Sequence, residues 1–168
     1  AGHMGIYGYH RDTTPFLDKF AKEGVVFDNC YAQSPNTLVS HVTMMTALQP
    51  EVHETTPEYI LSDEYKTLTE YLKEQGYKTA GFATHGSWLT RKMGFAQGFD
   101  HYECDFRSGA RNNQLIFKYL DENGDGRHFL FLHYYDVHSD YDRLPYWTGT
   151  EYDRRYCADY DGDFTGCI

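Results

Sequence analysis

A threonine close to the start of a predicted helix is the residue of this sequence whose type and position best suit nucleophilic chemistry. Thr37 follows a polar loop and precedes the segment 40–48, which we predict to be a short helix with Ser40 near its N-cap. A hydroxyl just before a helix N-terminus lies where backbone N–H groups and the helix dipole favour an anion. A bound Zn²⁺ or Ca²⁺ would favour ionisation of that hydroxyl to an alkoxide. The alternative is that Thr37 only caps a helix or a turn, because threonine is common there.

The helices and strands that must position this chemistry alternate along the chain. Capping signals and apolar spacing predict helices over 15–24, 40–48, 68–76 and 110–121. β-Branched and aromatic content predicts strands over 25–27, 77–84 and 128–133, and the last is apolar enough to be buried on both faces. Strands separated by helices indicate an α/β fold with a mostly parallel sheet covered by helices on both faces.

Both ends of the sequence favour part of a larger domain. No strand precedes the first predicted helix, and the chain closes on a segment rich in Tyr, Asp, Gly and Arg without periodicity. We therefore expect residues 1–168 to form a partial domain in which 139–168 are an irregular, loop-rich segment.

The composition excludes several classes of function. The 168 residues carry 15 basic and 25 acidic side chains, a net charge of −10, which argues against binding nucleic acid through its phosphates. The apolar runs are too short for a membrane span. A small anionic substrate stays compatible with this charge, because a metal or a helix N-terminus can create a local positive site.

Two acidic segments suggest a different hypothesis, a calcium-binding or interaction module. Residues 121–126 begin like a calcium loop, but the twelfth position is Leu132 instead of Glu, so a helix-to-strand turn is the better interpretation. Residues 159–163 lack the second half of such a loop. The four cysteines show no metal-site spacing, and we expect buried free thiols at Cys30, Cys104, Cys157 and Cys167.

Several segments, in the same order, closely resemble the N-terminal region of sulfatases, members of the alkaline-phosphatase-like superfamily of metal-dependent hydrolases. The resemblance spans nearly the whole chain and implies the fold of that superfamily. It is carried by Gly5-Ile6-Tyr7-Gly8-Tyr9, Thr13-Thr14-Pro15-Phe16-Leu17-Asp18, Glu23-Gly24-Val25-Val26-Phe27, Tyr31-Ala32-Gln33-Ser34-Pro35, Gly76-Tyr77-Lys78-Thr79-Ala80, Gly98-Phe99-Asp100-His101-Tyr102 and Leu132-His133-Tyr134-Tyr135-Asp136-Val137-His138.

The resemblance implies a sulfate-ester hydrolase in which Thr37 stands at the nucleophile position. Active sulfatases make formylglycine from Cys or Ser at the head of a C/S-x-P-x-R motif, and the matching stretch here is Thr37-Leu38-Val39-Ser40-His41. Threonine cannot become formylglycine. A phosphodiesterase or phosphonate monoesterase that uses threonine as the nucleophile, or a catalytically inactive relative, therefore stays open beside the sulfatase hypothesis.

The other site residues are also implied by the resemblance. His138 matches a family histidine that approaches the leaving oxygen, and His41 replaces the motif arginine and could bind an anionic substrate. His85 is a candidate substrate ligand near the positions, Thr84 and Gly86, where sulfatases carry Lys and His. The family cofactor is a divalent cation, Ca²⁺ or Mg²⁺ and alternatively Zn²⁺ or Mn²⁺. Thr37 would contribute one ligand to it, and we expect the other ligands to lie in segments outside this sequence.

Overall fold

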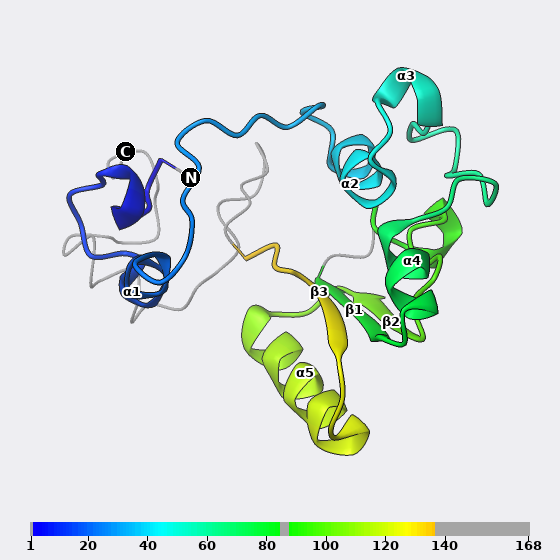
Figure 1. Ribbon diagram of the computed structural model, residues 1–168. Coiled ribbons are helices and arrows are strands. Elements are labelled where there is room, and N and C mark those ends of the chain that lie inside the picture. The colour runs from blue at the N-terminus through cyan, green and yellow to red at the C-terminus, as the bar shows by residue number, and fades with distance from the viewer. Residues whose placement is uncertain (1, 85–87, 137–168) are drawn as a thin grey trace. The chain divides into compact units, whose positions relative to one another are not determined.

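The computed structural model describes residues 2–84 and 88–136, and the chain divides into two compact units, residues 1–32 and 33–168. In the first unit the 3₁₀ helix η1 (Gly5–Tyr7) precedes helix α1 (Pro15–Ala21) (Figure 1). The Asp18 carboxylate joins them by accepting hydrogen bonds from the Ile6 N–H at 2.9 Å and the Thr14 hydroxyl at 3.0 Å. Thr14 as N-cap residue and Pro15 at the first helical position are as predicted.

The predicted strand over 25–27 is wrong. These residues are extended loop, and the side chains of Val25 and Phe27 are exposed. A strand is stabilised by hydrogen bonds to a neighbouring strand, and none of the described residues forms a strand beside this segment. β-Propensity without a pairing partner therefore does not produce a strand here.

The second unit holds a three-stranded parallel sheet in the order β2-β1-β3, so β1 is central (Figure 1). The sequence prediction missed β2, a short strand at the edge of the sheet. The elements of this unit are α2 (Thr37–Thr46), α3 (Pro50–His53), α4 (Leu68–Glu74), β1 (Lys78–Thr84), η2 (Arg91–Met93), β2 (His101–Asp105), α5 (Gly109–Asn123) and β3 (His128–His133).

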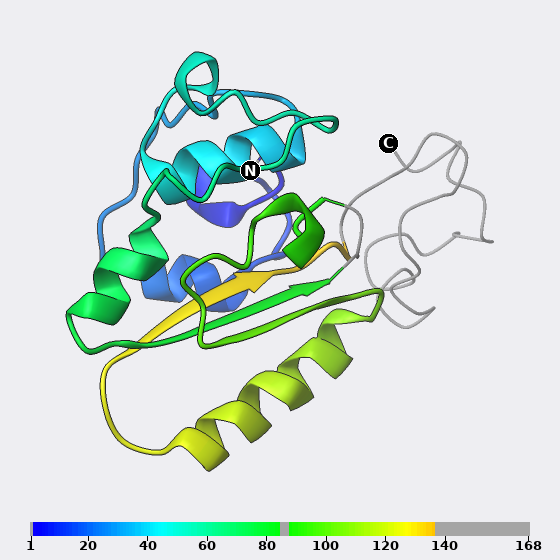
Figure 2. The same cartoon turned by 90° about the vertical axis from the view of Figure 1, so that its right-hand side faces the viewer.

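Helices cover both faces of this sheet, as the predicted α/β class requires. Figure 2 shows α5 on one side of the strands and α2 with α4 on the other. On the α5 side, Phe82 packs in one buried cluster with Ile116 and Tyr119. On the opposite side, Leu38 and Val42 of α2 belong to a second cluster that also contains Phe95, Phe99, Tyr102 and Phe131. Two separate apolar cores therefore hold the sheet between its helices.

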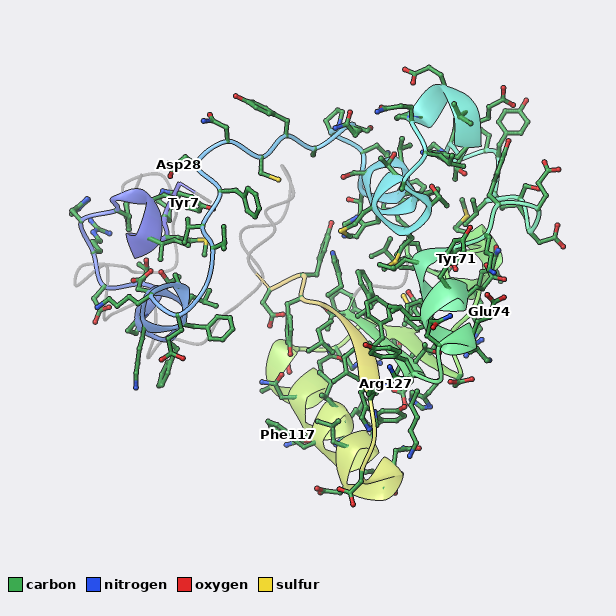
Figure 3. All side chains as sticks on the ribbon, viewed as in Figure 1. Tyr7, Asp28, Tyr71, Glu74, Phe117 and Arg127 are labelled. Atoms are coloured by element: carbon green, nitrogen blue, oxygen red, sulfur yellow. The ribbon has the colours of Figure 1, made fainter. Side chains whose placement is uncertain are left out.

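The local signals at α4 predict its ends correctly. The Thr67 hydroxyl accepts from the Glu70 N–H at 3.3 Å, and the Glu70 carboxylate accepts from the Thr67 N–H at 2.8 Å, which completes the capping box. Gly76, just after the helix, has a positive φ of 79°. Tyr71 and Glu74 lie on the outer face of α4 (Figure 3).

The prediction that β3 is buried on both faces is wrong. In this strand only Phe131 is buried, with 9% of its surface exposed, and Leu132 is 40% exposed. Within the described residues β3 pairs with β1 alone, so the edge of β3 away from β1 carries no neighbouring strand. An apolar run of the kind found in central strands thus forms an edge strand of this sheet.

Two smaller predictions concern the acidic segment and the cysteines. The segment 121–126 is a helix-to-strand turn, as predicted, since α5 ends at Asn123 and Leu132 lies inside β3.

Cys30 is exposed, which corrects the expectation of a buried thiol, because it lies in a loop and belongs to neither apolar core. Cys104 is half-buried. Cys157, Cys167, the acidic segment 159–163 and the predicted irregular segment 139–168 lie outside the described residues. None of the described helices has the length and apolar content needed to cross a membrane.

Candidate active site

Helix α2 begins at Thr37, so the predicted helix start at Ser40 is wrong by one turn. Asn36 is the N-cap residue, and its side-chain oxygen accepts from the Val39 N–H at 3.3 Å. Thr37 is therefore the first residue inside the helix and does not cap it. The Asn36 N–H donates to the Ser34 hydroxyl at 3.1 Å, but no described group accepts from the N–H of Thr37 or of Leu38. The N–H of Thr37, a half-buried residue, thus remains available for an anion at the positive end of the helix, whereas Leu38 is fully buried.

The Thr37 side chain is half-buried, and none of the described residues hydrogen-bonds its hydroxyl. Leu38, its neighbour, is fully buried and anchors the first turn of α2 in the core on that face of the sheet. The hydroxyl therefore sits on a fixed helix end and keeps its hydrogen-bonding capacity.

His41 lies one turn further along α2 and is tied to Thr37. Its Nδ1 is 2.7 Å from the Thr37 carbonyl oxygen. Because a carbonyl oxygen only accepts hydrogen bonds, Nδ1 is the donor, and the neutral ring then keeps its lone pair on Nε2. The imidazole packs edge to face against Phe95, Phe131 and His133, with ring centroids 6.1, 5.9 and 5.2 Å apart. These contacts hold the start of α2 against the carboxyl end of β3.

His133, the last residue of β3, is a residue that sequence reasoning treated only as part of a strand. Its ring stacks on Phe131 at 6.4 Å with an interplanar angle of 14° and lies 5.2 Å from His41. Positions 129, 131 and 133 alternate onto one face of the strand, and Phe129 and Phe131 pack with the core on the α2 side. The signal that could have identified His133 as a site residue is its position: it is a polar residue at the end of an otherwise apolar strand, on the face that packs toward α2.

The end of β1 and the start of α5 fix the segment that follows β3. The hydroxyl of Thr84, the last residue of β1, accepts from the Tyr135 N–H at 2.7 Å and donates to the His133 carbonyl at 3.3 Å. One oxygen of Asp136 accepts from the N–H of Gly109, the first residue of α5, at 2.8 Å. The chain is therefore anchored on both sides just before position 138.

The structure brings together two of the predicted site residues, Thr37 and His41, and adds His133. The other two, His85 and His138, lie outside the described residues; Thr84 directly precedes His85 in the sequence, and Asp136 lies two positions before His138. Thr84 takes a structural role as a buried hydrogen-bonding link between strands. His53 is buried, and its ring lies between the Thr43 hydroxyl at 3.0 Å and the Thr55 N–H at 3.1 Å.

The described residues do not form a site for a divalent cation. No group of three or more His, Cys, Asp or Glu side chains gathers among them. Thr37 offers a single hydroxyl, and Nδ1 of His41 is occupied by the Thr37 carbonyl. Hard cations require six or more oxygen ligands, so the donors in this part of the chain do not suffice.

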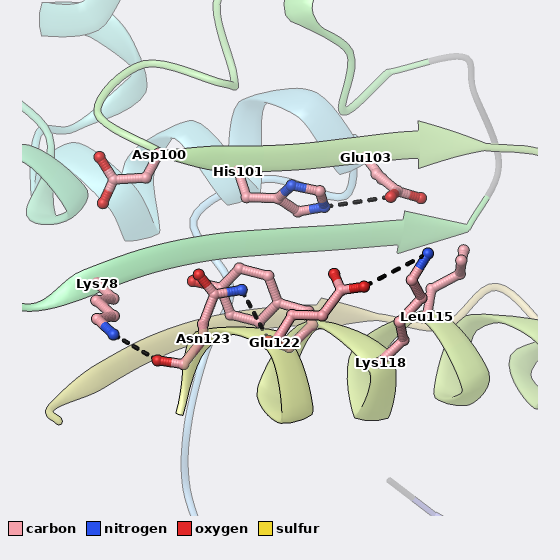
Figure 4. Close-up of a pocket in the computed structure, with 9 residues that line it drawn as sticks. Lys78, Asp100, His101, Glu103, Leu115, Lys118, Glu122 and Asn123 are labelled. Atoms are coloured by element: carbon pink, nitrogen blue, oxygen red, sulfur yellow. Dashed lines mark hydrogen bonds and ion pairs between the residues drawn. The ribbon is translucent and has the colours of Figure 1, made fainter. Parts of the chain in front are cut away.

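A separate hollow of about 510 Å³ lies on the α5 side of the sheet and is distinct from this site (Figure 4). The charged side chains that line it already have partners. His101 lies 3.2 Å from Glu103, Lys118 lies 3.7 Å from Glu122, and Lys78 donates to the Asn123 carbonyl. None of the site residues lines it, so it gives no support to ester chemistry.

The sequence matches the family model of the sulfatases over residues 1–165. This chain belongs to the sulfatase family. Its described fold is that of the alkaline-phosphatase-like superfamily, as the sequence resemblance implied.

Curated relatives are themselves sulfatases. The chain is 32% identical over 128 residues to an N-acetylglucosamine-6-O-sulfatase of Bacteroides thetaiotaomicron, a match that covers 76% of this chain and 22% of the relative. It is 30% identical over 124 residues to the human N-acetylgalactosamine-6-sulfatase, covering 62% of this chain and 24% of the relative. The chain thus spans about a quarter or less of the length of these relatives.

A solved structure supports the same fold. The C-terminal periplasmic domain of EcEptC from Escherichia coli, in complex with Zn, superimposes with a TM-score of 0.65 at 23% identity. The match covers 99% of this chain and 48% of that domain, so the described fold corresponds to about half of the larger domain.

Proposed function

We propose that this chain forms the ester-binding end of a sulfatase-like hydrolase of sulfate esters, with Thr37 as the nucleophile. The observation that carries the proposal is the Thr37 hydroxyl, which has no hydrogen-bond partner among the described residues. It stands on the first residue of α2, beside the unsatisfied N–H of Thr37. An ester oxyanion placed there would accept a hydrogen bond from this N–H and present its central atom to the hydroxyl.

Three histidines are proposed to orient the helix start, bind the ester or assist the leaving group. His41 is fixed by its bond to the Thr37 carbonyl and by its contact with His133, so it orients the first turn of α2. His138 follows the segment anchored by Thr84 and Asp136, and we assign it the role of donating a proton or hydrogen bond to the leaving oxygen. His85 is proposed as a further substrate ligand. The proposed reaction also includes a divalent cation, whose ligands, apart from Thr37, come from outside the described residues.

The identity of residue 37 favours a second candidate, hydrolysis of phosphate diesters or phosphonate monoesters. Threonine cannot supply the aldehyde on which formylglycine sulfatases depend, but its hydroxyl can attack phosphorus directly. A small anionic ester is the substrate class in both cases. A catalytically inactive relative is the third outcome that the experiment below distinguishes.

Turnover of two chromogenic esters by the full-length protein tests the proposal. p-Nitrophenyl sulfate reports sulfatase activity and bis-p-nitrophenyl phosphate reports diesterase activity, each assayed with added Ca²⁺, Mg²⁺, Zn²⁺ or Mn²⁺. We expect Thr37→Ala to lower kcat for the active ester by at least about a hundredfold. Thr56→Ala is the matched control, because Thr56 lies in an exposed turn where its hydroxyl bonds Glu58.

The outcomes separate the candidates. Hydrolysis of the sulfate that depends on Thr37 supports the first candidate, and hydrolysis of the diester that depends on Thr37 supports the second. If neither ester is hydrolysed with any of the four cations, the hypothesis of a catalytically inactive relative is supported. Equal activity of Thr37→Ala and the unmodified protein would remove Thr37 from the mechanism.

A further inference from the structure

A second cleft, of about 530 Å³, borders β2 and η2 on residues that the proposed active site does not use. Its volume lies within the range of small-molecule sites. It is lined by Thr90, Arg91, Lys92, Tyr102, Glu103, Cys104, Asp105 and Arg107. Three cationic side chains therefore face two carboxylates, in a chain whose net charge is −10.

The two carboxylates of the cleft are already engaged. Glu103 places one oxygen 3.2 Å from His101 Nε2 and the other 3.6 Å from Arg107 Nη1. One oxygen of Asp105 accepts from the Phe106 N–H at 2.7 Å. The lining carries three positive and two negative charges, a net charge of +1, and the Glu103–Arg107 contact leaves Arg91 and Lys92 without a carboxylate partner inside the cleft.

Arg107 has a buried guanidinium nitrogen that lacks a hydrogen-bond acceptor among the described residues. Its side chain is only 9% exposed, and its Nε donates to the Asn112 side chain at 2.9 Å. Its Nη2 is buried, and no described residue accepts a hydrogen bond from it. A buried charged donor without an acceptor is costly, so a ligand that supplies an oxygen to this guanidinium is stabilised by that deficit.

Arg91 and Lys92 bring two further cations to the same cleft. Arg91 is held in place because its Nη2 donates to the Tyr102 carbonyl at 2.9 Å and its guanidinium lies over the Tyr102 ring at 5.8 Å. Lys92 is exposed and forms no ion pair with any described residue. In the hollow of Figure 4, by contrast, both lysines contact an acceptor within the hollow itself.

We infer that the cleft between η2 and β2 binds an oxyanion group of the sulfate or phosphate type. Two of the cations lie on η2 and the third, Arg107, lies in the loop after β2. Three cations suit a tetrahedral ion, which offers more acceptor oxygens than a carboxylate does, and a guanidinium pairs well with such oxygens. Asp105 at the end of β2 is in register with Thr84 at the end of β1. The cleft therefore lies toward the carboxyl end of the sheet, the end that also carries Thr37 and His41.

Calorimetric titration of the folded chain tests this inference with two probes. Sodium sulfate represents the free ion and glucose 6-sulfate represents the same group on a sugar, each titrated at an ionic strength held constant with NaCl. We expect saturable binding with a Kd that Lys92→Gln and Arg107→Gln each raise about tenfold or more. Lys118→Gln removes one exposed cation from α5 and is expected to leave this Kd unchanged.

The variants also separate this cleft from the proposed active site. Thr37→Ala and His41→Ala should not change the Kd of cleft binding. If Thr37→Ala weakens sulfate binding and Lys92→Gln does not, the ion binds at the proposed active site. That result would refute the inference about the cleft and leave the proposed function intact. Arg107 is buried, so thermal unfolding must confirm that Arg107→Gln folds. Lys92 is exposed, and its variant alone decides the question if Arg107→Gln does not fold.

The relative affinity of the probes identifies the source of the oxyanion. Tighter binding of glucose 6-sulfate assigns the cleft to an ester-bearing ligand, and equal affinity assigns it to the free ion; both outcomes support the inference. Absence of saturable binding by both probes, or an unchanged Kd in Lys92→Gln, refutes it.

Discussion

Two buried threonines lead to stability predictions of opposite sign for the same substitution. The Thr84 side chain links the ends of β1 and β3, accepting from the Tyr135 N–H at 2.7 Å and donating to the His133 carbonyl at 3.3 Å. Thr69 in α4 is equally buried, but no described residue hydrogen-bonds its hydroxyl. Valine has nearly the shape of threonine and lacks the hydroxyl. Replacing each threonine by valine therefore isolates the contribution of one hydroxyl group.

The expected magnitudes follow from these contacts. Thr84→Val deprives a backbone N–H and a backbone carbonyl of a buried partner, which lowers the free energy of unfolding by about 1–3 kcal/mol. Thr69→Val removes a buried hydroxyl without a described partner and adds a buried methyl group, which raises that free energy by about 1 kcal/mol. Helix propensity contributes little to the second change, because valine and threonine rank close together.

Urea unfolding followed by far-UV circular dichroism measures both changes, from the midpoint and the slope m of each transition. An unchanged m in both variants ensures that the midpoint reports stability. Changes of the same sign at both positions would contradict the reasoning, because loss of the hydroxyl would then not act through its hydrogen bonds. Since Thr84 also anchors the chain before His138, we expect Thr84→Val to lower any Thr37-dependent turnover as well.

Three further predictions concern the core, a helix cap and a histidine. Gly81→Ala places a Cβ 2.4 Å from the buried Tyr102 ring, so the ring must shift and we expect a loss of about 1–3 kcal/mol in urea unfolding. Asn36→Ala removes the side-chain cap of α2 and should cost about 0.5–2 kcal/mol by the same measurement. Burial lowers the pKa of His53 below its ordinary value of 6.5, so the unfolded chain binds more protons there and the contribution of His53 to stability is lost as pH falls below 6.5. His53→Gln should therefore flatten the fall of the unfolding midpoint between pH 7.5 and 5, and an unchanged slope would contradict this.

Local signals predicted the elements whose ends are determined by their own residues. The capping box at Thr67, the glycine with positive φ at position 76 and the apolar face around Ile116 each act within one or two helical turns. Such interactions depend little on the rest of the fold. The helices and strands they define, α4, β1 and α5, therefore lie within two residues of their predicted ends.

The start of α2 was mispredicted because two good N-cap residues compete within one turn. Asn36 and Ser40 both have side chains that can accept from the helix N-terminus. Burial decides between them, since Leu38, Val42 and Met45 are spaced i, i+4 and i+7 and all lie in the core. A helix that began at Ser40 would leave Leu38 outside this row. The apolar spacing was readable in the sequence, and it outweighs the cap preference.

Tertiary contacts account for the parts of the site that the sequence did not predict. The 5.2 Å contact of His41 with His133 joins residues 92 positions apart in the chain, on a helix and on a strand. No periodicity relates such positions. The predictions of a strand over 25–27 and of a buried Leu132 were wrong for a related reason. Both properties depend on which other strands lie beside the segment.

The two departures from the sulfatase motif near Thr37 both acquire structural roles in this chain. Where the motif has proline, Val39 supplies an N–H, and that N–H is the one bonded by the Asn36 cap. Where the motif has arginine, His41 bonds the Thr37 carbonyl and packs on rings from β3 and the loop before β2. The helix start is thus held by a cap and an imidazole, neither of which requires a cation at this position. The departures therefore change the charge beside the Thr37 hydroxyl, while the hydroxyl stays on the first residue of the helix. For this reason we expect the departures to alter the class of ester that binds and not the geometry of the site.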